Sequence, residues 1–268
     1  MTAASLRTRV AGQRAMRAVV DAEAAARPRT RLEGILGIRA LSPDARRAYD
    51  TARGDAAVGQ ALEQLGQRWD VLHDVPVGGG RTIDHLAIGP GGVYAIRAAH
   101  CSGADVVVEG AALTIGGVAR DDLIELAEAA GVAEQLLAAA AAAASALVTA
   151  TVVPLFVAVD AGRIVMRAPH DRVGVLELPQ VRRTLAHARP RLPGDTVASI
   201  SDLADRPTTW PTAQDDDHAT LRREFQWIRD RVRVALRRRT AWAIAVFAVG
   251  ACTMTGAIAA YVTLVARA

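Results

Sequence analysis

The feature that most restricts the folding of this chain is a long run of uncharged residues near its end. Between Arg239 and Arg267 lie 27 consecutive residues with no acidic or basic side chain. A helix of that length extends roughly 40 Å, whereas the hydrocarbon core of a bilayer is roughly 30 Å thick, so a tilted helix can span it. The sequence therefore predicts one transmembrane helix over residues 240–266.

Arginines beside this run predict its direction. Membrane proteins keep basic flanking residues on the cytoplasmic side, and an anionic leaflet attracts them. Only Arg267 follows the run, whereas six arginines precede it closely: Arg229, Arg231, Arg233, Arg237, Arg238 and Arg239. We expect a single-pass protein of the cytoplasmic membrane, with its N-terminal part in the cytoplasm and anionic lipid headgroups as partners. Gly256 and Ala260 form a small-xxx-small pair that suits a homodimer through this helix.

The N-terminal sequence and the cysteines favour the same compartment. The first twenty residues include several arginines and no apolar core, which argues against a secretory signal peptide. One cysteine, Cys252, lies in the predicted span and the other, Cys101, lies far before it, so an intrachain disulfide is not expected. All 32 basic residues are arginine, and the chain has neither Lys nor Asn, a bias typical of GC-rich bacterial genomes.

Composition and periodicity divide the chain into five parts. We predict a basic helical arm at 1–41, an α/β domain at 42–210, a linker at 211–219, a basic juxtamembrane helix at 220–239 and the transmembrane helix at 240–266. In the α/β domain, Ser42-Pro43-Asp44 is typical of a helix start. Glycine turns separate strand patterns at 69–77, 82–89 and 93–99, which predicts an antiparallel meander. Further strands are expected at 104–110, 112–117, 149–160, 163–168 and 174–178, and helices at 121–147, 178–188 and 197–204.

One segment inside the domain competes with the C-terminal run as a membrane span. Residues 136–159 are also uncharged, but acidic residues flank them, Pro154 interrupts them, and the composition changes from Ala to Val and Thr near Val148. These features favour a buried helix followed by a buried strand.

Several of these segments together resemble the nuclease-related domain family. They are the helix GDAAVGQALEQL, the strand WDVLHDVPV, the hairpin TIDHLAIGPGGVYAI, and the later VVPLFVAVD, GVLEL and TTW, within roughly residues 50–210. The family is similar to the PD-(D/E)XK nucleases, which implies an α/β fold whose mixed sheet has an antiparallel hairpin core flanked by helices. The implied chemistry is phosphodiester hydrolysis by a divalent metal held by carboxylates, with a Lys that activates water.

The resemblance also assigns positions, and two of them depart from the family pattern. Asp55 falls at the helical acid and Asp84 at the hairpin acid, whereas Arg97 replaces the acid of D/E-x-K and Ala99 replaces its Lys. A guanidinium cannot ligate a cation and does not lose its charge. The chain has no lysine that could substitute. We therefore expect a degenerate centre without a cofactor, in which Asp84 pairs with a nearby arginine, and Arg97 is one candidate.

Three functional hypotheses follow. The first is a membrane-anchored binding or scaffolding module without catalysis. The second is a divergent nuclease that acts on DNA or RNA near the membrane with Mg²⁺ or Mn²⁺, in which Asp105 or Glu109 supplies the missing acid and His100 a base. The third is a structural membrane protein with no nucleic-acid role. His73, Asp74 and His85 are close in sequence, but their spacing matches no compact metal motif.

Overall fold

The computed structural model describes the backbone of residues 5–211 and 218–265. In the last helix it describes the side chains of residues 220–256 and of Ile258. The predicted linker at 211–219 falls largely on residues 212–217, outside the described residues. The chain divides into a larger unit, residues 1–18 and 47–221, and a smaller unit, residues 19–46 and 222–268.

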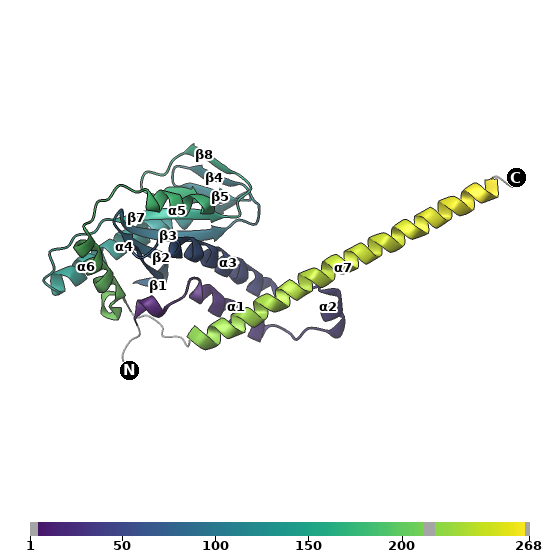
Figure 1. The fold of residues 1–268 in the computed structure, drawn as a ribbon, viewed down its shortest axis with the longest axis horizontal. Coiled ribbons are helices and arrows are strands. Elements are labelled where there is room, and N and C mark those ends of the chain that lie inside the picture. Colours follow the sequence, from purple (N-terminus) through teal and green to yellow (C-terminus); the bar gives the residue numbers. More distant parts are fainter. Residues whose placement is uncertain (1–4, 212–217, 266–268) are drawn as a thin grey trace. The chain divides into compact units, whose positions relative to one another are not determined.

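The larger unit is built on a five-stranded sheet with the order β1-β2-β3-β7-β9 (Figure 1). Its strands are β1 (Asp70–Gly78), β2 (Arg81–Gly89), β3 (Gly92–His100), β7 (Val152–Val159) and β9 (Gly174–Glu177). The first three form the predicted antiparallel meander, which is confirmed. Since β7 pairs parallel with both β3 and β9, the sheet is mixed.

A second sheet of four strands has the order β6-β5-β4-β8. It contains β4 (Val106–Glu109), β5 (Ala112–Ile115), β6 (Val118–Arg120) and β8 (Ile164–Ala168). The pair β4 and β8 is parallel and the other pairs are antiparallel, so this sheet is also mixed. The predicted α/β class is confirmed, but the strands form two sheets because β4 and β8 pair with each other instead of joining the main sheet.

Helices cover both faces of the five-stranded sheet. One face packs against α3 (Pro43–Glu63) and α5 (Leu178–Ala186), with Leu62 and Leu185 buried against Ile96 and Val157. The other face packs against α4 (Asp122–Ala143) and α6 (Gly194–Asp205), around the fully buried Phe156. The short helices η1 (Leu6–Thr8) and η2 (Pro207–Thr209) complete this unit.

The internal uncharged segment is two elements, as predicted. The helix α4 ends at Ala143 and β7 begins at Val152. Among the residues that the structure describes, α4 is the one helix long and apolar enough to cross a membrane by length and composition, and 33% of its apolar window is buried. Its buried side chains, including Leu123, Leu126 and Leu137, belong to the main core cluster.

The smaller unit contains the end of α1 (Gln13–Ala25), α2 (Arg31–Leu36) and most of α7 (His218–Val265). The helix α2 begins with a capping box between Thr30 and Glu33 and ends at Gly37, which has a φ of 67°. A Cβ at Gly37 would lie 2.2 Å from the carbonyl oxygen of Ala235, so only glycine allows α2 to approach α7 this closely.

The helix α7 changes character along its length. Over residues 220–256 it is not apolar as a whole, because its first half carries the arginines counted above. In its second half the large apolar side chains are exposed, among them Ile244, Val246, Phe247, Val249 and Met254. The predicted transmembrane span at 240–266 includes residues whose side chains the structure does not describe, so it stays a prediction.

Candidate functional site

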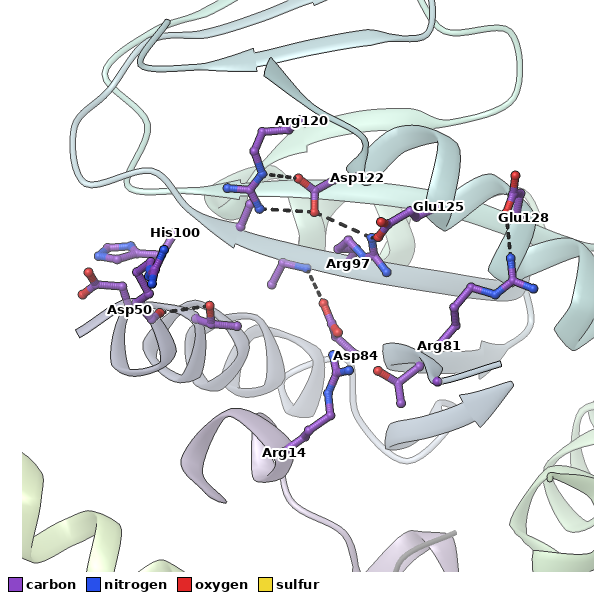
Figure 2. Close-up of a pocket in the computed structure, with 16 residues that line it drawn as sticks. Arg14, Asp50, Arg81, Asp84, Arg97, His100, Arg120, Asp122, Glu125 and Glu128 are labelled. Carbon is purple, nitrogen blue, oxygen red and sulfur yellow. Dashed lines mark hydrogen bonds and ion pairs between the residues drawn. The ribbon is translucent and has the colours of Figure 1, made fainter. Parts of the chain in front are cut away.

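A cavity of about 780 Å³ opens in the larger unit beside β2, β3 and the start of α4 (Figure 2). Charged side chains of both signs surround it: Arg14, Arg47, Asp50, Arg81, Asp84, Arg97, Arg120, Asp122, Glu125 and Glu128. Two sequence-predicted positions, Asp84 and Arg97, therefore lie in one cavity, and Ala99 and His100 line it as well.

Asp84 is held by the backbone of the neighbouring strand. The ladder between β2 and β3 begins at the pair His85 and Ile96, so the amide of Ala98 has no backbone partner on β2. The Oδ2 atom of Asp84 accepts that hydrogen bond at 3.1 Å. Burial raises the pKa of the Asp84 carboxyl, and the positive charge of Arg97 and the bond from Ala98 oppose this rise.

Arg97 pairs with α4 and not with Asp84. Its Nη1 atom lies 2.7 Å from Oε2 of Glu125 and 3.6 Å from Oδ1 of Asp122. The side chain of Arg97 is 13% exposed and that of Asp122 is 14% exposed, so this pair is largely shielded from water. The predicted Asp84–Arg97 pair is wrong as a contact, because Arg97 points to the sheet face that α4 covers while Asp84 bonds the backbone of β3.

Asp55 lies behind the cavity wall and does not line the cavity. Its side chain packs under Gly12, where a Cβ would lie 3.0 Å from the Cβ of Asp55. It is 3% exposed, and its Oδ1 atom has no hydrogen-bond partner. Burial raises the pKa of Asp55 well above its ordinary value, and the charges of Asp84 and Asp74 raise it further.

Asp74 joins this buried acidic group from β1. Its φ is 49°, it has no paired residue on β2, and its Oδ2 atom accepts a hydrogen bond from the backbone amide of Arg14 at 2.9 Å. Burial raises the pKa of Asp74 to about 6 despite that bond. The sequence indicated Asp55 and Asp84, but the positive φ that turns Asp74 toward them has no signal in the sequence.

These residues do not fit a divalent metal. Mg²⁺ takes ionised oxygen ligands and keeps several waters. Here one oxygen of Asp84 is bonded to an amide, Asp55 does not line the cavity, and Arg97 brings a positive charge to the position of the missing acid. Across the described part of the chain, no group of three or more His, Cys, Asp or Glu residues is arranged to hold a metal.

The acids that could have substituted lie elsewhere. Asp105 pairs with Arg163 at 2.7 Å just before β4 and β8, Glu109 pairs with Arg167 at 3.3 Å on these strands, and neither acid lines the cavity. Asp122 and Glu125 were not predicted as site residues; the sequence indicated only that a helix starts near them. Their acidic character in the first turn of α4 was the available signal.

The two strand histidines form a separate buried pair. His73 and His85 are opposite each other on β1 and β2, and their Nδ1 atoms are 2.8 Å apart. Burial lowers the pKa of His73 to about 4 and that of His85 well below its ordinary value. Two neutral rings can share this hydrogen bond, with one ring as donor and the other as acceptor.

Residues 51–150 match the family model described as the nuclease-related domain. The chain contains a nuclease-related domain. The matched residues include Asp55, Asp84, Arg97 and Ala99, and they extend through α4, so the predicted resemblance is confirmed for this part of the chain. No curated protein and no solved structure matches the chain. The nuclease-related domain of this chain thus has an arginine, bound by two acids of α4, on the wall of its charged cavity.

Proposed function

We propose that this chain is a membrane-anchored nuclease-related domain that does not cleave nucleic acid and acts as a binding or scaffolding module on the cytoplasmic face. The observation that carries this proposal is the contact of Arg97 with Glu125 and Asp122 in the cavity. A guanidinium keeps its positive charge at every accessible pH. It supplies permanently the countercharge that a metal supplies in the related nucleases.

The remaining parts of a hydrolytic centre are also missing from this cavity. Ala99, at the position of the family's Lys, has only a methyl group and cannot position or activate water. Asp55 does not line the cavity. His100 does line it, but a base alone leaves the charge that develops on a scissile phosphate without stabilisation.

The membrane part of the proposal is supported by α7. Its exposed apolar side chains after Trp242, the absence of charge between Arg239 and Arg267, and the arginines before that run suit a helix that enters a bilayer from the cytoplasm. Anionic lipid headgroups are the proposed partners of Arg229, Arg231, Arg233, Arg237, Arg238 and Arg239.

Cleavage assays test the catalytic part. The full chain, purified in neutral detergent, is incubated with labelled DNA and RNA in the presence of Mg²⁺ or Mn²⁺. We expect no cleavage by the wild type, and salt-dependent binding without cleavage would support a binding module. Cleavage that is lost in Asp84→Ala and retained in the control Asp171→Ala, an exposed position, would establish the divergent nuclease instead. Absence of any nucleic-acid binding would favour a structural role.

Extraction and protease protection test the anchor. The full chain in native membranes should resist alkaline extraction, and removal of residues 240–268 should release it. Protease added to sealed, inside-out vesicles should digest the two units, and protease added to right-side-out vesicles should not. Release of the full chain by alkaline extraction would contradict the proposed anchor.

A further inference from the structure

A second, smaller cavity lies entirely within the smaller unit. Its volume is about 110 Å³, and four arginines line it, Arg27, Arg29, Arg39 and Arg231, together with Glu23 and Ser42. We call it the arginine pocket. Sites for drug-sized ligands are roughly 300–1,000 Å³, so this pocket admits only a small chemical group.

Positive charge exceeds negative charge around the arginine pocket. Glu23 contacts Arg231 closely and lies 3.7 Å from Arg29, while Glu33 pairs with Arg27 at 2.6 Å and lies 3.7 Å from Arg39. Glu23 also accepts a hydrogen bond from the amide of Ser42 at 2.6 Å. Two carboxylates thus neutralise the charge of four guanidinium groups only in part. The carboxylate of Glu23 also uses one of its acceptor positions for the amide of Ser42.

Three guanidinium nitrogens are buried without a hydrogen-bond partner: Nη2 of Arg29, Nη1 of Arg39 and Nε of Arg231. The first two lie 3.7 Å from carboxylate oxygens of Glu23 and Glu33, which is ion-pair distance but too long for a hydrogen bond. Buried donors without partners are unfavourable, and they are uncommon in folded proteins. Burial and the nearby charges of Arg231 and Arg39 lower the pKa of Arg29, and the carboxylates of Glu23 and Glu33 oppose this only in part. The backbone of Arg39 has a φ of 53°, a left-handed conformation that is uncommon for arginine. An anion among these arginines would accept hydrogen bonds from the unpartnered nitrogens, and its negative charge would favour the charged form of Arg29.

We propose that the arginine pocket binds a phosphate group. A phosphate has several acceptor oxygens, which suit the guanidinium donors around the pocket. It carries one or two negative charges, which suit the excess of two positive charges. The size of the pocket limits the ligand to the phosphate itself, with the remainder of the molecule outside.

The position of α2 favours a lipid headgroup as the source of this phosphate. Four large apolar side chains, Leu32, Ile35, Leu36 and Ile38, are exposed on or just after α2. Two hydrogen bonds join α2 to α7 where the uncharged run begins: Arg238 donates to the carbonyl of Gly34 at 2.7 Å and Trp242 to that of Ile35 at 3.1 Å.

Exposed apolar side chains beside a cationic pocket are typical of elements that lie at the membrane interface. The lipid assignment rests on the membrane anchor proposed above, whereas the phosphate site rests only on the pocket. A soluble phosphate would use the same donors.

Trp227 provides a reporter for the test, because the guanidinium carbon of Arg231 lies 4.8 Å from the centre of its ring. The full chain in neutral detergent micelles is titrated with inorganic phosphate, with dihexanoyl phosphatidic acid, and with sodium chloride at equal ionic strength. We expect a saturable fluorescence change with the first two ligands and not with chloride. The signal should disappear in Trp227→Phe, while calorimetry on that variant should still detect binding.

Matched double variants then locate the site. Arg29→Gln with Arg39→Gln should weaken phosphate binding at least about tenfold, since two charge-assisted hydrogen bonds are lost. The control, Arg182→Gln with Arg189→Gln, removes the same charge from exposed positions of the larger unit and should change affinity by less than about threefold. Arg39→Lys keeps the charge without the fork and should give an intermediate affinity, which guards against misfolding of the double variant.

The outcomes separate the proposals. Absence of saturable binding, or equal weakening by both double variants, would overturn the phosphate site. Tighter binding of phosphatidic acid than of inorganic phosphate would support the lipid source, and equal binding would assign the pocket to a soluble phosphate. Neither result depends on nuclease activity or alkaline extraction, so failure of the function proposed above would be recognised separately.

Discussion

Arginines gather at two places in this chain, and their relation to carboxylates is different at each. In the cavity of the larger unit, Arg97 is bonded to Glu125, Arg81 to Glu128 at 2.6 Å, and Arg120 to Asp122 at 3.0 Å. In the arginine pocket of the smaller unit, arginines outnumber acids, and three of their buried nitrogens have no hydrogen-bond partner.

This difference separates an arginine that stabilises a fold from arginines that are available to a ligand. In the cavity, each of these three guanidinium groups is paired with a carboxylate of α4, and the pairs of Arg97 join β3 to that helix. In the arginine pocket, the same chemical group is left with open donors, and an external anion would complete it. Pairing, and not the number of arginines, therefore distinguishes the two sites.

The largest expected effect is that of Arg97→Ala. The substitution leaves Glu125 without its partner and removes the strongest positive charge acting on the buried Asp84, while Asp122 keeps Arg120 at 3.0 Å. Unpairing a mostly buried charge costs about 3–4 kcal/mol of unfolding free energy. Denaturant unfolding of the full chain in detergent measures it. The control Arg163→Ala breaks an exposed pair with Asp105 and should cost less than about 0.5 kcal/mol. Equal losses would show that Arg97 is not structural.

The buried acids behind the cavity give the next effect, which depends on pH. The pKa of Asp74 is about 6 in the folded state against 3.8 as its ordinary value, so the folded state binds the proton more tightly. The stability from this group is full below pH 3.8 and is lost as pH rises through 6.

Asp74→Asn removes this titration. Between pH 4 and pH 7.5 the wild type should lose about 2–3 kcal/mol of unfolding free energy that Asp74→Asn does not lose, so the difference between the two proteins should shift by that amount in favour of the variant. Unfolding curves at several pH values measure the difference, with Asp105→Asn as an exposed control that should show none. If the stabilities of Asp74→Asn and the wild type change in parallel with pH, Asp74 does not titrate differently on folding.

A third variant compares the two arginine sites directly. Glu23→Gln removes a negative charge that contacts Arg231 and lies near Arg29, so phosphate should bind about fivefold more tightly to the arginine pocket. Glu125→Gln removes the corresponding partner of Arg97 in the cavity and should leave phosphate affinity within about twofold. The fluorescence titration of Trp227 measures both. An unchanged or weaker affinity in Glu23→Gln would argue against an anion among these arginines.

The elements of the larger unit could be predicted because their signals are local. Alternating apolar residues and glycine turns indicated β1, β2 and β3, and Pro154 with the change from Ala to Val separated α4 from β7. The separation into two sheets was missed, because the pairing of β4 with β8 joins residues more than fifty positions apart. Strand patterns alone do not say which strand pairs with which.

The candidate site could be predicted only in part, because its side-chain contacts also join residues that are far apart in the sequence. The family pattern located Asp55, Asp84, Arg97 and Ala99, but it could not reveal that Arg97 turns to Glu125, 28 residues away. The arginine pocket has no sequence signal at all. Arg231 is about two hundred residues from Glu23, and in a chain with 32 arginines no single one stands out.

The smallest expected effect concerns the contact between α2 and α7. Trp242→Phe removes the hydrogen bond from its indole nitrogen to the carbonyl of Ile35, and the Trp242 side chain is 46% exposed, so the loss should be about 0.5 kcal/mol. Amide hydrogen exchange across residues 31–38 measures this loss, and protection should fall about twofold. Thr240→Val is the control, because the hydroxyl of Thr240 bonds only within α7.

The same variant also tests whether the arginine pocket depends on that contact. Since Arg29, Arg39 and Arg231 are untouched, phosphate affinity should stay within about twofold of the wild type. A loss as large as that of the Arg29→Gln and Arg39→Gln pair would mean that the docking of α2 on α7 assembles the donors. The positions of the unpartnered guanidinium groups would then depend on the contact between α2 and α7. The arginine pocket would differ from the cavity because its donors are positioned by that contact, and not because arginines outnumber acids.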